Sequence, residues 1–240
     1  MRISNIVLAI VIISVSSCRY FGGERVYGDG HIVTQQRNTG GFEKVDVSGG
    51  IKVHVRQEAS PSVKLELDQN LMEYIDVYTE GNTLVIKEKQ GYNVQATKDI
   101  IVYVAAPVFK DIDVSGACDI IGDNTITGNQ ELNLHVSGSG DIFMEVALPK
   151  LFAEISGSGS INIKGQATNF SAHVSGSGDV KCLDLSTDVT ELDLSGSSDA
   201  EVNANKQLNI EASGSSSITY KGNASVNQNI SGSGSVKKIG

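Results

Sequence analysis

The chain has 240 residues, of which 28 are acidic and 19 are basic, and its net charge at pH 7 is −9. No run of basic residues is present, so the composition excludes a nucleic-acid-binding surface as the expected function. Tryptophan is absent, which argues against an enzyme that holds polysaccharides on aromatic platforms.

Residues 1–17 resemble a bacterial lipoprotein signal peptide. Arg2 gives a positive start, and Ile6–Ile13 is an apolar stretch too short to span a bilayer as a helix. The motif Val-Ser-Ser-Cys ending at Cys18 resembles a lipobox, in which Cys18 becomes the first residue of the mature protein and carries acyl chains such as palmitate. We therefore expect an outer-membrane lipoprotein of the cell envelope that faces the periplasm or the cell surface. The alternative is an ordinary secretory signal with a chance cysteine.

The next stretch, residues 18–40, is expected to be a lipid-anchored tether and N-terminal cap, with irregular structure as far as Glu43. Residues 41–240 are expected to form one domain. From Phe42 onward, apolar and polar residues alternate in short runs that predict strands. Asn70–Ile75 predicts either a short helix or the beginning of a strand.

A seven-residue frame recurs along the second half of the chain. Its clearest copy is Val136–Ile142, Val-Ser-Gly-Ser-Gly-Asp-Ile, and the first serines of successive copies from Ser115 are 22, 19, 19, 20, 18 and 18 residues apart. A fixed period near 20 residues indicates a solenoid, in which each coil buries its apolar face against its neighbours. Phe42–Gly49 echoes Phe109–Gly116, so the N-terminal part is predicted to be an elaborated form of the same coil.

Alignment of the copies on their first serine separates inward from outward positions. The residues one and three places before the serine are apolar, with Gln228 the exception, and the residue between them is polar. Alternate residues of a strand point to opposite faces, so this pattern predicts two inward columns and one outward ladder. We predict an all-β, right-handed parallel β-solenoid with coils of 18–22 residues, each made of two short strands joined by two turns.

The outward ladder includes His135, Glu154 and His173, whose neighbours are expected about 4.8 Å apart. Favourable pairing between neighbouring strands is the preferred interpretation, and a zinc site is the alternative. A second ladder lies at the glycine-rich turns and consists of Asp119, Asp141, Asp179 and Asp199, with Ser160, Ser217 and Ser235. A calcium site is one hypothesis for this ladder, but Asp and Ser also cap turns through local hydrogen bonds. We expect no metal and no cofactor.

Cys118 and Cys182 remain once Cys18 is assigned to the lipid. Cys118 is expected in a corner turn, and Cys182 in an inward column three coils further on. Three coils span about 14 Å, which exceeds the roughly 7 Å limit between the Cα atoms of a disulfide. We predict no disulfide and a buried Cys182.

Phe42–Gly49, Asn70–Ile75, Gly81–Ile86, Ile100–Pro107 and the serine-glycine repeats together resemble the head GIN domain family, the adhesin heads of Bacteroidetes lipoproteins and secreted proteins. The resemblance implies a β-solenoid at the cell envelope and implies no catalytic residues. No P-loop, zincin or Gly-X-Ser-X-Gly signature is present.

These observations favour a non-enzymatic, adhesin-like or surface-contact module that binds a glycan or an envelope protein through its outward ladders. One alternative is a structural scaffold that self-associates through the end of the solenoid. A polysaccharide-processing β-helix enzyme is the third hypothesis.

Overall fold

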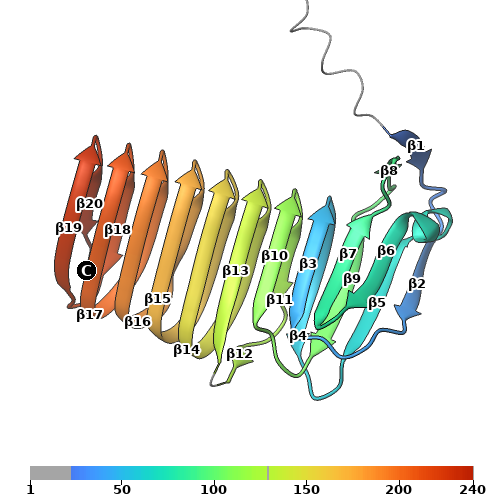
Figure 1. Cartoon of the computed structure of the whole chain (residues 1–240), viewed down its shortest axis with the longest axis horizontal. Helices are drawn as coiled ribbons and strands as arrows, with labels where there is room; N and C mark the ends of the chain where they lie inside the picture. Colours follow the sequence, from blue (N-terminus) through green and yellow to red (C-terminus); the bar gives the residue numbers. More distant parts are fainter. Residues whose placement is uncertain (1–22, 129, 240) are drawn as a thin grey trace, which may run out of the picture.

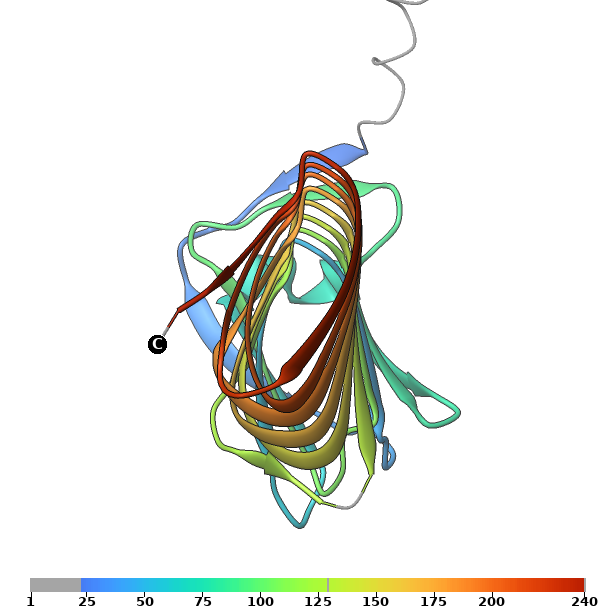
Figure 2. The same ribbon diagram turned by 90° about the vertical axis from the view of Figure 1, so that its left-hand side faces the viewer.

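The computed structural model describes residues 23–128 and 130–239. Its strands stack side by side into a single elongated solenoid, with the N-terminal strands at one end and β19 and β20 at the other (Figure 1). Viewed along the stack, the coils are flattened ovals that lie one behind another (Figure 2). The predicted β-solenoid is therefore confirmed.

The strands fall into an N-terminal group and a repeat group, separated where β9 leads into β10. The N-terminal group contains β1 (Glu24–Tyr27), β2 (Ile32–Arg37), β3 (Lys44–Gly49), β4 (Ile51–Gln57), β5 (Ser62–Asp68), the 3-10 helix η2 (Gln69–Tyr74), β6 (Ile75–Glu80), β7 (Thr83–Glu88), β8 (Tyr92–Gln95) and β9 (Ile100–Ala106). The repeat group contains β10 (Asp111–Gly116), β11 (Asp119–Gly122), β12 (Ile126–Thr127), β13 (Glu131–Gly138), β14 (Asp141–Gly157), β15 (Ser160–Gly176), β16 (Asp179–Gly196), β17 (Asp199–Gly214), β18 (Ser217–Lys221), β19 (Ser225–Gly232) and β20 (Ser235–Lys238).

Within the repeat group every pairing is parallel, and the repeat serines lie opposite one another. Ser137 pairs with Ser156, Ser156 with Ser175, and Ser175 with Ser195. The two predicted inward columns are buried from the first coil to Ala212. Only the last coil opens them, at the partly buried Ile230 and the exposed Gln228. Burial of this continuous apolar column by stacking is what holds the coils together.

The glycine that follows each repeat serine forms one sharp corner of the coil. Gly157 has φ +137°, and a Cβ atom built on it would lie 2.3 Å from the carbonyl oxygen of Gly138 in the preceding coil. That oxygen accepts a hydrogen bond of 2.8 Å from the amide of Ser158. Only glycine combines this backbone conformation with so close an approach.

The prediction of two short strands per coil was wrong for the middle coils. β14, β15, β16 and β17 each run unbroken from one serine-glycine corner to the next, so that each of these coils has one sharp corner and one broad bend. The last coil has the two predicted short strands, β18 and β19. The broad bend lacks the repeated Ser-Gly sequence of the sharp corner and keeps most of its strand pairing while it curves (Figure 2). β-Bulges in this region, such as the one between Asn162 and Gly165, accommodate the changes of direction.

The N-terminal group continues the stack, but not in the order of the chain. β3 lies between β7 and β10, and β4 lies between β9 and β11, all in parallel pairing. Val45 is opposite Ile112, which confirms the predicted echo. The stack ends in antiparallel strands, with β6 on β7, β5 on β9 and β2 on β5. Antiparallel strands occupy the edges that another parallel coil would need.

The irregular structure expected for residues 24–43 was wrong in part, because β1 pairs with β8 and β2 pairs with β5. Both structures considered for Asn70–Ile75 are present, one after the other: the short helix η2 ends at Tyr74, and the strand β6 begins at Ile75.

A buried carboxylate ties the loops of the N-terminal group together. Asp68 has 0% exposure. It accepts hydrogen bonds from the amide of Gly30 at 2.7 Å, the amide of Thr97 at 2.9 Å and the hydroxyl of Thr97 at 2.7 Å. Burial raises the pKa of Asp68, but these hydrogen bonds outweigh it and hold the pKa below its ordinary value.

Candidate binding face

One broad face of the repeat group carries the predicted outward ladder, and we call it the ladder face. It consists of the outward side chains of β10, β13 and β19 and of the second halves of β14–β17. Each member of the ladder is in register with the next, as the sequence predicts. The ladder runs through Asp113, His135, Glu154, His173, Asp193, Glu211 and Asn229.

The histidines of the ladder do not share one carboxylate. His135 Nδ1 lies 3.2 Å from Glu154 Oε2, whereas His173 Nε2 lies 3.9 Å from Asp193 Oδ2 on the following strand. No group of three or more potential metal ligands occurs among residues 23–128 and 130–239. The ladder is therefore a row of neighbouring polar pairs on the sheet surface.

An aromatic side chain joins the two histidines. The ring centroid of Phe152 lies 5.7 Å from that of His135 and 5.3 Å from that of His173. Phe152 is half-buried and lies on β14, four residues before the repeat serine. The repeat alignment did not single out Phe152, although its even spacing from the repeat serine places it in a second outward column.

Two shallow hollows lie side by side on the ladder face. They enclose about 490 Å³ and 390 Å³, and both are lined by Ser171 and Glu191. The larger hollow is rich in planar amide and carboxylate groups, and none of its lining residues is a lysine or an arginine. It is lined by Ser171, His173, Glu191, Leu192, Asp193, Gln207, Asn209, Ile210, Glu211, Asn227 and Asn229. The smaller hollow adds Phe152 and Phe170.

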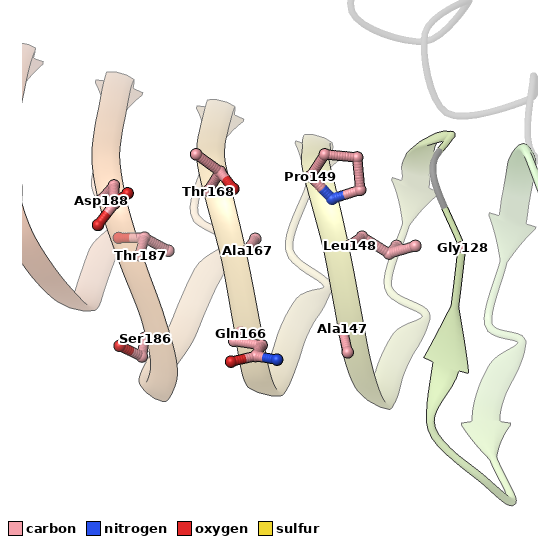
Figure 3. Close-up of a pocket in the computed structure, with 10 residues that line it drawn as sticks. All are labelled: Gly128, Ala147, Leu148, Pro149, Gln166, Ala167, Thr168, Ser186, Thr187 and Asp188. Carbon is pink, nitrogen blue, oxygen red and sulfur yellow. The ribbon is translucent and has the colours of Figure 1, made fainter.

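A third hollow lies over the broad bend, away from the ladder (Figure 3). It encloses about 470 Å³ and crosses β14, β15 and β16. Gln166, Thr168, Ser186 and Asp188 supply its polar groups, and no aromatic side chain lines it. This surface offers hydrogen bonds without a stacking partner.

The aspartate ladder at the sharp corner makes contacts between neighbouring coils as well as along one strand. Asp141 Oδ1 accepts bonds from the amide of Ser160 at 2.9 Å and from its hydroxyl at 2.6 Å, and Ser160 is its partner on the next coil. Asp179 lies 3.2 Å from the amine of Lys181 on the same strand. These contacts differ from the local turn caps that the sequence suggested, because the side chains bind across the stack or to a lysine.

Both cysteines of the repeat group are free and buried. Cys118 lies in the corner after β10, and Cys182 lies inside β16 in the inward column that the sequence predicts. Burial raises the pKa of Cys118 to about 11 and that of Cys182 to about 12. Thiols with such values are protonated at neutral pH and serve as small apolar side chains.

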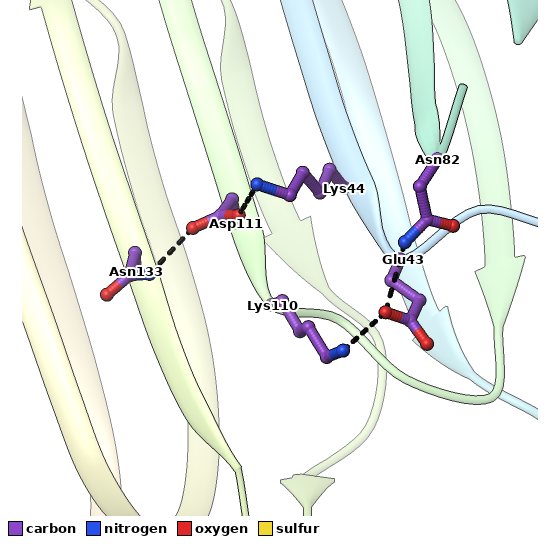
Figure 4. Close-up of polar contacts among 6 residues, drawn as sticks. All are labelled: Glu43, Lys44, Asn82, Lys110, Asp111 and Asn133. Atoms are coloured by element: carbon purple, nitrogen blue, oxygen red, sulfur yellow. Dashed lines mark hydrogen bonds and ion pairs between the residues drawn. The ribbon is translucent and has the colours of Figure 1, made fainter. Parts of the chain in front are cut away.

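Two polar triads join the repeat group to the N-terminal group, and we call them the junction clamp (Figure 4). In the first, Asp111 lies between the Lys44 amine at 2.5 Å and the Asn133 amide at 2.6 Å. In the second, Glu43 binds Lys110 at 2.6 Å and Asn82 at 3.0 Å. Burial raises the pKa of Asp111, but Lys44 and Asn133 outweigh it and hold the pKa below its usual value.

Cys18 and the rest of the proposed signal peptide lie outside the described residues, as do the first residues of the tether. Among residues 23–128 and 130–239, no helix has the length and apolar character needed to cross a membrane.

The stacked coils, the glycine corners and the ladder face define a parallel β-solenoid with an extended polar surface. Residues 41–224 match the family described as "Putative auto-transporter adhesin, head GIN domain". The chain belongs to this family, which confirms the resemblance drawn from its sequence.

Solved structures share the fold. A "putative adhesin" from Bacteroides fragilis is 21% identical with a TM-score of 0.81, and the alignment covers 89% of this chain and 100% of that one. A "putative lipid binding protein" from Parabacteroides distasonis is 23% identical with a TM-score of 0.74, covering 90% of this chain and 100% of that one. A "putative adhesin" from the same species is 26% identical with a TM-score of 0.71, with coverage of 90% and 100%. The search of curated proteins gave no match.

The family and these neighbours fit an adhesin-like protein at the cell surface or envelope, and they fit binding better than catalysis.

Proposed function

We propose that this chain is a non-catalytic, lipid-anchored binding module of the bacterial cell envelope that holds a glycan on its ladder face. The observation that carries the proposal is the His135–Phe152–His173 cluster beside two hollows lined with amides and carboxylates. Sugar rings present apolar C–H faces and many hydroxyls, so they suit an aromatic side chain flanked by planar hydrogen-bonding groups.

The rigidity of the surface supports this function. Each outward side chain stands on a strand that is paired on both sides, so the polar groups are fixed before a ligand arrives. A pre-organised surface loses little conformational entropy on binding. The repeat also presents similar groups at every coil, so a polymeric ligand can contact several coils at once.

The experiment is a glycan-array and envelope-extract binding screen with the full chain, followed by titration and product analysis for each hit. For a ladder-face ligand, Phe152→Ala is expected to weaken binding about tenfold, or about 1.4 kcal/mol. Phe143→Ala is the matched control, because Phe143 is exposed on the first half of β14, outside the ladder face. Equal loss in both variants, a protein ligand in place of a glycan, or release of a cleaved product would each refute the proposal.

The membrane anchor is a separate part of the proposal. Acyl chains on Cys18 would hold the module at the outer membrane, facing the periplasm or the cell surface. Labelled palmitate is expected to enter the wild-type chain and to be absent from Cys18→Ala. Label in both proteins would refute the anchor without affecting the ladder face.

Self-association is the second candidate function. In the described part of the chain, no strand pairs with the outer side of β19 or β20, and Val226, Ile230 and Val236 are only partly buried there. A second copy could pair with these edges. Sedimentation across a hundredfold range of concentration should then show a dimer that Val236→Lys removes, and a monomer at every concentration would exclude it.

A further inference from the structure

A pit opens above Ala105 on the broad face of the solenoid that is formed by β4, β5, β9 and β11, opposite the ladder face. Ala105 lies on β9, between Arg56 of β4 and Ser62 of β5 in the strand register. It belongs to an outward column, yet only 7% of it is exposed because its neighbours are larger and surround it. The hollow encloses about 360 Å³.

A row of three large side chains borders the pit. Lys64, Tyr103 and His54 lie in register on β5, β9 and β4. The amine of Lys64 lies 4.4 Å from the centroid of the Tyr103 ring, and the His54 ring lies 5.3 Å from the same centroid. The Tyr103 ring thus supports a cation on one side and an imidazole on the other. Gln36 completes the wall beyond Lys64.

The carboxylates near the pit already have partners. Glu58 Oε1 binds Arg56 Nε at 3.0 Å, and Asp123 Oδ1 binds His54 Nδ1 at 2.8 Å. Lys64 takes part in none of the ion pairs formed by residues 23–128 and 130–239. The pit therefore has one unpaired ammonium group and, near Ala105, a guanidinium that is paired with Glu58 through its Nε atom.

The tyrosine hydroxyl already has a partner. Burial raises the pKa of Tyr103, and the charges of Glu66 and Asp123 and a hydrogen bond to Glu66 raise it further. The phenol consequently keeps its proton at neutral pH and donates a hydrogen bond to Glu66. The donors left for a ligand at the rim are the ammonium, guanidinium, amide and serine hydroxyl groups.

We propose that this pit binds the carboxylate of an acidic sugar of the uronic-acid type, with the carboxylate above Ala105 between Lys64 and Arg56. A carboxylate is planar and accepts paired hydrogen bonds from a guanidinium, and such charge-assisted bonds are about twice as strong as neutral ones. Ser62 and Gln36 are placed to meet the hydroxyls of the same sugar. No lysine or arginine lines the larger hollow on the ladder face, and the Lys150 amine of the smaller hollow lies 3.9 Å from the Glu131 carboxylate. The pit above Ala105 differs from both because its lysine has no ion pair within the described part of the chain, so the two faces suit different sugar chemistries. This site is independent of the proposed ladder-face function.

Calorimetry with the full chain tests the proposal, using a trimer of galacturonic acid and the same trimer with its carboxyl groups reduced to alcohols. The acidic trimer is expected to bind, with affinity that falls as salt is added, and the reduced trimer is expected to bind at least tenfold more weakly. Ala105→Leu, which fills the pit without changing charge, and Lys64→Gln are each expected to weaken binding at least tenfold.

Two controls match these variants. Ala147→Leu makes the same change in the hollow over the broad bend, and Lys181→Gln removes a lysine paired with Asp179; both should stay within twofold of wild type. If Ala105→Leu fails to fold, Ala105→Val and Lys64→Gln carry the test. Absence of acidic-trimer binding, equal binding of the two trimers, or unchanged affinity in the pit variants would overturn the proposal. The Phe152→Ala variant should bind the acidic trimer normally, so failure here is distinguishable from failure at the ladder face.

Discussion

Removal of the Asp68 carboxylate is expected to destabilise the N-terminal group strongly. In Asp68→Ala, the amides of Gly30 and Thr97 and the hydroxyl of Thr97 lose their acceptor. Each buried donor left without a partner costs about 1–3 kcal/mol. Some of these groups can gain water where Gly30 and Thr97 reach the surface, so the sum is expected to be about 3–5 kcal/mol.

Urea unfolding followed by circular dichroism measures this change, and hydrogen exchange locates it. Exchange should accelerate first in β1, β2 and β8, which flank the Asp68 contacts. Asp99→Ala is the matched control, because Asp99 is 65% exposed and makes one surface ion pair with Lys52; such pairs contribute about 0–1 kcal/mol. A loss below about 1 kcal/mol for Asp68→Ala would show that the buried carboxylate does not hold these loops.

The same carboxylate gives a pH dependence with a definite sign. The folded pKa of Asp68 lies below its ordinary value of 3.8. Its contribution to stability is therefore complete above that value and is lost as pH falls through the lower, folded pKa. The free energy of unfolding should fall below about pH 4, and Asp68→Asn should fall less steeply. Parallel acid curves for the two proteins would contradict the assignment.

The other predictions concern the glycine corner, the junction clamp and the thiols. Gly157→Ala should lower the free energy of unfolding by about 3 kcal/mol or more, because its Cβ would meet the Gly138 carbonyl at a positive φ; a midpoint equal to wild type would refute this. Asp111→Ala should lower it by about 1–3 kcal/mol in urea titrations, since Lys44 and Asn133 lose their shared partner. Cys118 and Cys182 should resist iodoacetamide at pH 8 until the chain unfolds, and rapid native labelling in mass spectra would show exposed thiolates.

The repeat group was predictable because its information is local. A strand exposes alternate residues to opposite sides, so the sequence around each serine assigns Val136 inward and His135 outward without reference to the rest of the chain. The sharp corner was predictable for the same reason, since the repeated glycines lie directly beside the serines. The broad bend was not, because ordinary residues curve there through bulges that leave no fixed pattern.

The arrangement of the N-terminal group could not be predicted from the sequence, because its contacts join residues that are distant in the chain. In the sequence, Asp68 is only the last polar residue of a predicted strand. Folding brings it to Gly30 and Thr97, which are 38 and 29 residues away. The pit above Ala105 could not be predicted from the sequence either. β4 and β5 are consecutive in the chain, but β9 lies between them in the sheet, so the neighbours of Ala105 could not be read from their order.

The difference between the sharp corner and the broad bend determines where a coil can gain or lose residues. The repeat serines stay opposite one another although their spacing varies between 18 and 20 residues from Ser137 onward. The register shifts lie on the stretch that runs from the sharp corner through the broad bend, between Cys182 and Ser186 and between Thr187 and Val189, while the ladder face remains aligned. Insertions and deletions can therefore accumulate in this stretch, which lets one side of the molecule diversify while the other keeps its spacing.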